Sequence, residues 1–123
     1  MNRPDTITIY IKVKDDYVKR TINDVYWYGS DSINISGRGI VESDSINIII
    51  DKENVKNYVD NRYFNVNNEE EYTLQNGMRI VRGIGPDINS INELDDSYEQ
   101  ITIFSFDVNI VGSSLDNLYI RGK

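Results

Sequence analysis

The sequence predicts a mainly β protein, built as a small antiparallel β-barrel or β-sandwich with one short helix. Composition is the first reason: the chain has 19 Ile and 10 Val but only 4 Leu and no Ala, and β-branched side chains suit a pleated surface. Apolar and polar residues also alternate along several stretches, with the period of a strand. Turn-forming residues separate these stretches at roughly even intervals, as in sandwiches and small barrels.

The length of 123 residues predicts a single domain, 1–123, with room for a core that needs no metal or disulfide cross-links. The strongest strand signal covers residues 6–14, where positions 7, 9, 11 and 13 are apolar and the positions between them are polar. A turn at Asp15 and Asp16 leads into a second strand at 17–22.

A further turn at Asn23 and Asp24 separates this strand from an aromatic one at 25–28. We expect another short strand at 32–35, ended by the glycine-rich stretch 36–39. The apolar run at 45–50 reads as a strand buried on both faces.

Asp51 is placed to cap a short helix that runs to about Val59, with an extended crossover as the alternative. Asn76-Gly77 then indicates a hairpin with a type I′ turn, because both central residues of that turn need positive φ. Its paired strands would be 72–75 and 78–82.

The stretch 87–98 is polar and acidic, and we interpret it as a long exposed loop. After it, residues 100–111 form a strand whose mixed alternation indicates a bulge or cover on both faces. A turn at 112–114 leads into a last strand at 115–120.

Composition also argues against most enzymes. The chain has no Cys and no His, so the usual thiol nucleophile, general base and commonest metal ligand are missing. The formal charge of −7 argues against gripping nucleic acid, which needs clustered Lys and Arg. The absence of a long apolar run predicts no membrane span or secretion signal, and therefore a cytoplasmic protein.

Three patterns resemble binding or catalytic sites, but each has a simpler interpretation. Gly83-x-Gly85 and Gly37-x-Gly39 do not continue into a phosphate loop and are interpreted as turns. The oxygen-rich residues of the acidic loop do not follow the EF-hand spacing, because Ile91 stands where the third ligand belongs. Adjacent Asp pairs suit turns, and nothing converges, so we expect a non-enzyme without cofactor or metal.

Aromatic residues are the more informative feature. Trp27 is expected in the core, whereas Tyr26, Tyr28 and Tyr63 are candidate anchors of a protein interface, since large rigid rings with a polar end suit such contacts. Candidate residues of an exposed contact loop come from the acidic stretch, and they are Asp87, Asn89, Asn92, Glu93, Asp95 and Asp96.

Five segments together resemble a known group of proteins. They are DTITIYIKVKDD, YVKRTINDVYWYG, SINIII, YTLQNGMRIVRGIG and LDNLYIRGK. In this order they resemble small minor capsid or head–tail connector proteins, encoded among the head and neck genes of tailed phages and prophages of Gram-positive bacteria. The fourth segment is similar to that group's GD-x-IV-x-G element, with Met78 where an Asp is commoner.

The resemblance implies a structural protein of the virion neck, stopper-like, assembled in the host cytoplasm as a ring of the hexamer or dodecamer kind. Its partners would be other copies, a portal or adaptor protein, tail proteins and DNA that passes without specific binding. The acidic loop would then face the channel or the next ring. The alternative is a carbohydrate- or peptide-binding β-sandwich that uses Tyr26, Trp27, Tyr28 and Tyr63 as a stacking surface.

Overall fold

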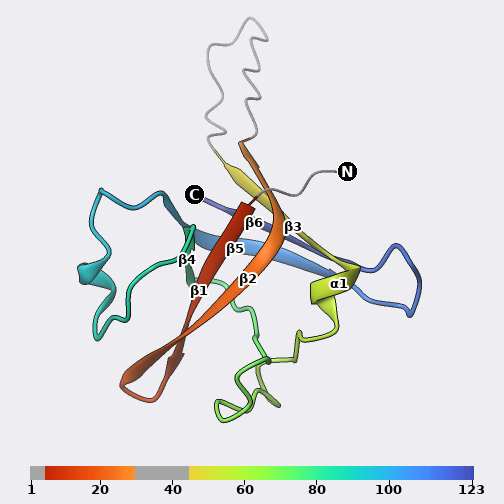
Figure 1. Ribbon diagram of the computed structural model, residues 1–123, viewed down its shortest axis with the longest axis horizontal. Coiled ribbons are helices and arrows are strands. Elements are labelled where there is room, and N and C mark those ends of the chain that lie inside the picture. The colour runs from red at the N-terminus through yellow and green to blue at the C-terminus, as the bar shows by residue number, and fades with distance from the viewer. Residues whose placement is uncertain (1–4, 30–44) are drawn as a thin grey trace, which may run out of the picture.

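The computed structural model describes residues 5–29 and 45–123, which fold as a closed antiparallel β-barrel (Figure 1). Around the barrel the strands follow the order β1-β2-β3-β6-β5-β4. The elements are β1 (Asp5–Val13), β2 (Asp16–Gly29), β3 (Ile46–Asp51), α1 (Lys52–Val55), β4 (Arg79–Arg82), the 3₁₀ turn η1 (Ile91–Glu93), β5 (Gln100–Asn109) and β6 (Asn117–Gly122). The predicted fold class is confirmed, and the barrel is the correct one of its two architectures.

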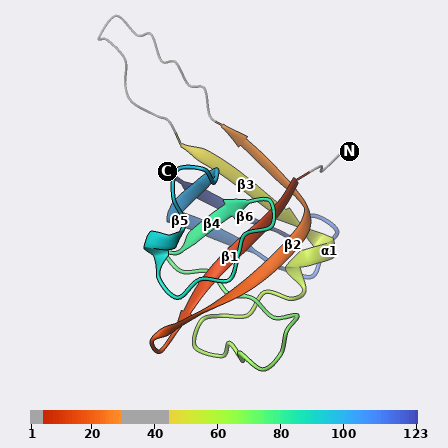
Figure 2. The same cartoon turned by 60° about the vertical axis from the view of Figure 1, so that its left-hand side comes forward.

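The barrel closes because β2 and β5 each pair with different strands along their length (Figure 2). The first part of β2 pairs with β1, and its last residues, Tyr26 to Gly29, pair with β3. The register slips between these parts, because Asp5 pairs with Val25 whereas Ile7 pairs with Ile22. Such a bulge bends a strand and increases its twist, which lets one strand serve two halves of the barrel.

The predicted turn at Asn23 and Asp24 is therefore wrong, because both residues lie in this bulge within a continuous strand. Asp24 has a φ of 61°, the left-handed conformation that Asp tolerates better than most residues. Thr6 Oγ1 donates a hydrogen bond to Asn23 Oδ1 over 3.0 Å and so ties the bulge to β1. Turn-forming residues here produce a bend, not the end of a strand.

The second bulge lies in β5 between Ile103 and Ser105 and confirms the irregularity expected in this strand. Gly122 lies opposite it, and a Cβ at that position would come within 2.8 Å of the Thr102 carbonyl oxygen and 2.4 Å of the Ile101 side chain. The bulge also shifts the alternation: Ile101 and Ile103 are buried before it, and Phe106 packs on the core after it.

The barrel interior is filled mainly by Ile, as the alternation in β1 predicts. Its buried residues are Ile7, Ile9, Ile11, Ile22, Val25, Trp27, Ile48, Ile50, Val55, Tyr72, Leu74, Ile80, Ile101, Ile103, Leu118 and Ile120. Trp27 is 6% exposed, which confirms its expected place in the core. The Arg82 guanidinium lies 5.7 Å from the Trp27 ring centroid and is held by Asp5 (2.9 Å) and Glu99 (3.1 Å).

The predicted hairpin around Asn76-Gly77 is wrong in its pairing. Gly77 has a φ of 95°, but Asn76 does not have positive φ, so the turn is not type I′. β4 pairs with β1 and β5 instead of with 72–75. The reason is tertiary: Tyr72 and Leu74 are buried in the core, and closing the barrel supplies β4 with partners on both sides.

The helix is shorter than predicted, since α1 covers only Lys52–Val55. Asp51 precedes it with an extended backbone and makes no side-chain capping bond. Tyr58 forms an isolated parallel bridge to Tyr72, and Val59 N donates to Tyr72 O over 2.9 Å, which ends the helix. Within the described residues, no helix has the length and apolar character to span a membrane. The strand expected at 32–35 and the glycines of 36–39 lie outside the described residues.

The acidic stretch 87–98 is not a wholly exposed loop, because it covers the outer side of β1 and β4 (Figure 2). Ile88 and Leu94 are buried against Tyr10 and Val81, in a second apolar cluster outside the barrel. Tyr10 Oη donates to Pro86 O over 2.7 Å, and a Cβ on Gly85 would lie 2.1 Å from that Oη. Gly85 thus allows the chain to cross closely over the Tyr10 ring, a role beyond that of a turn residue.

Candidate functional site

The structure uses several candidate residues of the acidic stretch for local backbone geometry. Glu93 accepts hydrogen bonds from the amides of Asn89 (2.6 Å) and Ser90 (2.7 Å), forming a capping box for η1. Asp95 accepts hydrogen bonds from the Ser97 hydroxyl and from the Ser97 amide (2.9 Å), and these two bonds hold the pKa of Asp95 below its ordinary value.

The remaining candidates of this stretch are exposed and dispersed. Asp87 lies 3.5 Å from Lys19 Nζ with its side chain 92% exposed, and Asn92 and Asp96 also face solvent. Among the described residues no group of three or more carboxylates gathers where it could hold a metal ion. We call the exposed acidic residues of 87–98 the acidic rim. Their carboxylates do not converge on one point.

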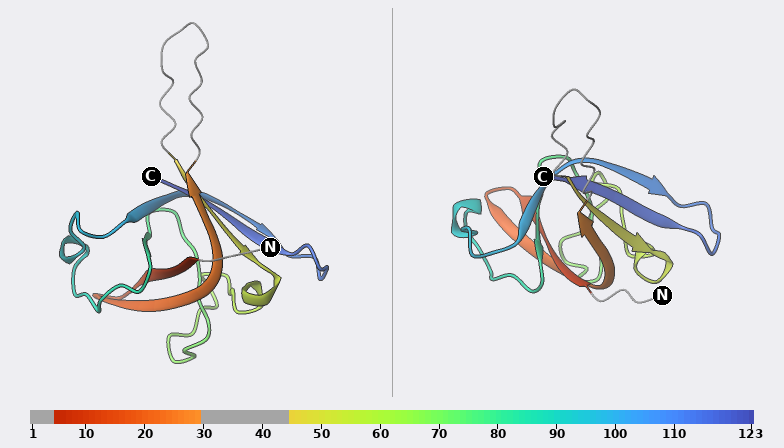
Figure 3. Two further views of the ribbon diagram at one scale, coloured as in Figure 1. Left: turned by 45° about the horizontal axis from the view of Figure 1, so that its top comes forward. Right: turned by 90° about the horizontal axis from the view of Figure 1, so that it is seen from above.

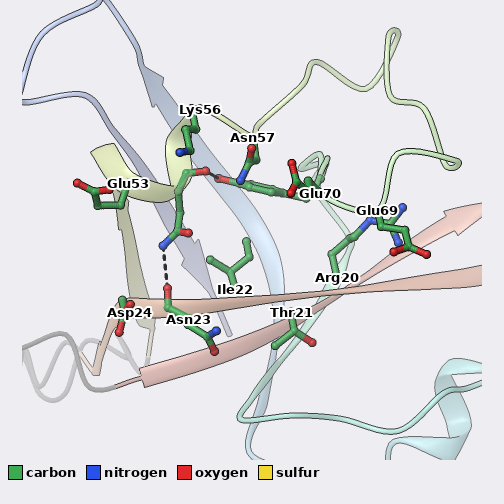
Figure 4. A pocket seen from close by; sticks show the side chains of 12 residues that line it. Arg20, Thr21, Ile22, Asn23, Asp24, Glu53, Lys56, Asn57, Glu69 and Glu70 are labelled. Atoms are coloured by element: carbon green, nitrogen blue, oxygen red, sulfur yellow. Dashed lines mark hydrogen bonds between the residues drawn. The ribbon is translucent and has the colours of Figure 1, made fainter.

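An open polar cavity of about 540 Å³ lies between β2, α1 and the loop that precedes Tyr72 (Figure 4). Arg20 donates to the carbonyl oxygens of Glu71 (2.8 Å) and Val66 (2.9 Å), and burial lowers its pKa. Asn54 Nδ2 donates to Asn23 O over 2.7 Å. These hydrogen bonds attach the loop and the helix to β2. We therefore interpret the cavity as a structural feature and not as a ligand site.

A different surface brings together two of the predicted interface aromatics. We define the tyrosine–arginine face as Tyr26, Tyr28, Asp107, Tyr119 and Arg121 on the outer side of β2, β6 and β5. Their alternation with buried residues of the same strands, such as Val25, Trp27, Leu118 and Ile120, directs them outward.

Strand register explains how this face forms. Tyr28 is paired with Asn47, Asn47 with Arg121, and Arg121 with Ser105, so one row crosses four strands. The adjacent row runs from Tyr26 through β3 and Tyr119 to Asp107. Side chains in such rows lie close enough to interact.

The contacts within the face hold it in one arrangement. The Tyr26 and Tyr28 rings meet edge to face at 5.4 Å, and the Tyr28 and Tyr119 hydroxyls lie 3.2 Å apart. Tyr119 Oη donates to Asn47 Oδ1 over 2.9 Å.

Arg121 completes the arrangement on the β6 side. Its guanidinium lies 4.5 Å from the Tyr119 ring centroid and donates to Asp107 Oδ2 and Ser105 Oγ, each over 3.1 Å. The hydrogen bond with Tyr119, followed by burial, raises the pKa of Tyr28 to about 12. The face therefore carries fixed phenol rings beside a paired guanidinium.

Tyr63, the third predicted aromatic, belongs to another part of the molecule. It is 70% exposed and stacks with Arg62, whose guanidinium lies 5.4 Å from its ring centroid. Trp27 is buried and cannot take part in a stacking surface. Tyr119 and Arg121 are not predicted from the sequence, because their proximity to Tyr26 and Tyr28 depends on the order of strands around the barrel. Alternation within 115–120 was the available signal for which of its residues face outward.

The hairpin of β5 and β6 extends beyond the barrel (Figure 3), and its tip carries exposed apolar residues. Val111 is 84% exposed and Leu115 is 81% exposed. Asp116 holds this tip by accepting from the amides of Val111 (2.9 Å) and Ser113 (3.1 Å), bonds that lower its pKa. The tip therefore exposes two large apolar side chains while Asp116 fixes the backbone between them.

A family model that covers residues 3–123 matches the chain, with the description "family of unknown function (DUF6751)". The chain belongs to this family. No curated protein and no solved structure matches it. The matched residues include both bulges and the tyrosine–arginine face.

Proposed function

We propose that the protein is a structural component of a tailed-phage neck, a head–tail connector that assembles as a ring between portal and tail. The observation that carries the proposal is the tyrosine–arginine face. Tyr and Arg are enriched among the residues that dominate protein interfaces, and this set is exposed or half-buried yet already fixed by its own contacts. Such preorganisation reduces the ordering cost of assembly.

The acidic stretch has a separate place in this proposal. Asp87 and Asp96 are exposed, and the overall charge of the chain is −7. We place this rim toward the DNA channel, where negative charge repels phosphates and lets DNA pass without binding. Buried Ile88 and Leu94 would keep the rim in position.

The alternative is a carbohydrate- or peptide-binding module that uses the exposed tyrosines. Trp27 is buried and Tyr63 lies in another part of the molecule. Tyr26 and Tyr28 are therefore the aromatic pair available for stacking. Two rings in an edge-to-face contact offer a smaller flat platform than the four residues considered from the sequence. The geometry therefore favours a protein partner.

The direct test is to delete the gene from an inducible prophage or phage that carries it and to examine the particles by electron microscopy. We expect filled or partly filled heads without attached tails, restored by the wild-type gene supplied in trans. The variant Tyr26→Ala with Arg121→Ala should fail to restore tails, whereas Asn67→Ala, an exposed change away from the face, should restore them. Normal tailed, infectious particles from the deletion would show that the protein has no neck function.

A further inference from the structure

The outer half of β5 has a free edge. From Ser105 to Asn109, β5 pairs with β6 on one side. On the other side the pairing with β4 covers Gln100 to Thr102, and the backbone bonds with Gly77 and Met78 end at Ile103. In the part of the chain that the structure describes, no strand pairs with this second side, and β5 forms the outer strand of the projecting hairpin (Figure 3).

Beyond the bulge between Ile103 and Ser105, this edge has no proline, no lysine and no unpaired inward charge to prevent pairing with another chain. Phe104 is 50% exposed and Val108 is 43% exposed, so the edge shows apolar side chains as well as backbone groups. The charge of Asp107 is balanced by Arg121 at 3.1 Å. Exposed edges of this kind accept an added strand, because the unpaired amide and carbonyl groups gain hydrogen bonds.

We infer that the edge pairs with the same edge of a second copy of this chain, in antiparallel orientation and centred on Phe106. The segment Phe104-Ser105-Phe106-Asp107-Val108 alternates apolar and polar residues in the same pattern in both directions. With Phe106 opposite its counterpart, Phe104 lies opposite Val108 and Ser105 lies opposite Asp107. Apolar residues then meet apolar residues, and a hydroxyl meets a carboxylate.

The neighbouring registers are less favourable, so the segment specifies this one. Centring the pair on Asp107 sets two carboxylates opposite each other, which destabilises a strand pair. Centring it on Ser105 sets Asp107 opposite Ile103. The favourable register also joins the two tyrosine–arginine faces into one continuous sheet surface, because Ser105 and Asp107 both bond to Arg121.

The contact is two-fold symmetric and therefore joins copies in pairs. This strand contact makes the proposed function more specific. It rests on that proposal, because the proposal supplies the premise that copies of the chain assemble. A ring needs a second, different contact, for which the tyrosine–arginine face is available. A chain that is monomeric in solution but still required for tails would overturn the strand pairing and leave the neck function in place.

The test compares the oligomeric state of the full chain and three double variants by sedimentation over a range of concentrations. The wild type should form dimers. Phe104→Lys with Val108→Lys sets like charges opposite each other twice and should raise the dimer dissociation constant roughly tenfold or more. Phe104→Lys with Val108→Glu sets Lys opposite Glu in this register and should restore dimers, with an affinity that falls as salt rises.

The matched control is Val111→Lys with Leu115→Lys, which adds the same charge at the exposed hairpin tip and should leave the dimer intact. Circular dichroism confirms that each variant folds. A second measurement uses the absence of native Cys: Phe106→Cys should form disulfide-linked dimers on mild oxidation, and Val111→Cys should not. A monomeric wild type up to the roughly millimolar range, an undiminished Lys/Lys dimer, or a Lys/Glu variant as weak as Lys/Lys would each overturn the inference.

Discussion

Tyrosines lie on two outer sides of the barrel, but only on one side does another part of the chain cover them. Outside β1 and β4, Tyr10 is almost fully buried, because Ile88 and Leu94 of the acidic stretch pack over it. Outside β2 and β6, Tyr26 and Tyr28 stay in contact with solvent and are fixed only by one another, Tyr119 and Arg121.

Covered and uncovered tyrosines should contribute differently to the stability of the fold. A covered tyrosine stabilises the fold, because its ring is removed from water and its hydroxyl is bonded to Pro86 O. An uncovered row of tyrosines adds less to stability, and under the proposed function a partner would supply its cover. Substitutions on the two sides should therefore have opposite consequences for folding and for assembly.

The largest effect is expected on the covered side. Leu94→Ala removes a buried side chain and should lower the free energy of unfolding by about 2–4 kcal/mol. Urea denaturation measures this, and Asp96→Ala on the same stretch is the control, with a change within about 0.5 kcal/mol. A Leu94→Ala change as small as that of the control would mean that the acidic stretch does not stabilise the barrel.

Gly85→Ala comes next. The added Cβ would lie 2.1 Å from Tyr10 Oη, so the ring or the crossing chain must move, at a cost of about 1–3 kcal/mol. The cost should fall when Tyr10→Phe is added, since the clashing oxygen is then absent. The double-mutant cycle measures this coupling, and strict additivity of the two changes would contradict the close contact.

A smaller effect is expected on the pH dependence of the free energy of unfolding, through the buried Tyr10. Burial, with lesser contributions from Tyr98 and Asp87, raises the pKa of Tyr10 to about 12, against about 10 in the unfolded chain. The neutral phenol thus favours the folded state: its contribution is complete below about pH 10 and is lost as pH rises toward 12.

The free energy of unfolding should accordingly fall between about pH 10 and pH 12, and less steeply in Tyr10→Phe. Denaturation at several alkaline pH values measures the slopes. Tyr28, whose pKa is also about 12, keeps part of the dependence in that variant. Equal slopes in the wild type and in Tyr10→Phe would show that Tyr10 titrates normally.

The smallest change in stability is expected on the uncovered side. Tyr26→Ala removes a ring that is 38% exposed and should alter the free energy of unfolding by less than about 1 kcal/mol. The same variant, combined with Arg121→Ala, is the one expected to lose tail attachment. A large loss of stability would place Tyr26 with the structural residues and remove the contrast between the two sides.

Some residues of the candidate site could be predicted from the sequence, and others could not. Tyr26 and Tyr28 were predicted as interface residues because they flank Trp27 at alternating positions, and the structure places them together on the outside. Tyr119 and Arg121 were not predicted, since β2 and β6 are far apart in the chain and meet through β3. The acidic residues were recognised as exposed, but the capping role of Glu93 and the anchoring of Leu94 were not.

The sequence by itself determined the class of fold, the strand at 6–14 and the burial of Trp27, because alternation and β-branched composition act locally. Tertiary structure alone decided that Asn23-Asp24 bends a strand instead of ending it, and that β4 pairs with β1 and β5 instead of with 72–75. It also decided that Gly85 and Gly122 serve close crossings. The physical reason is that closing a barrel is a non-local constraint, which selects among turn and pairing options that are nearly equal in local energy.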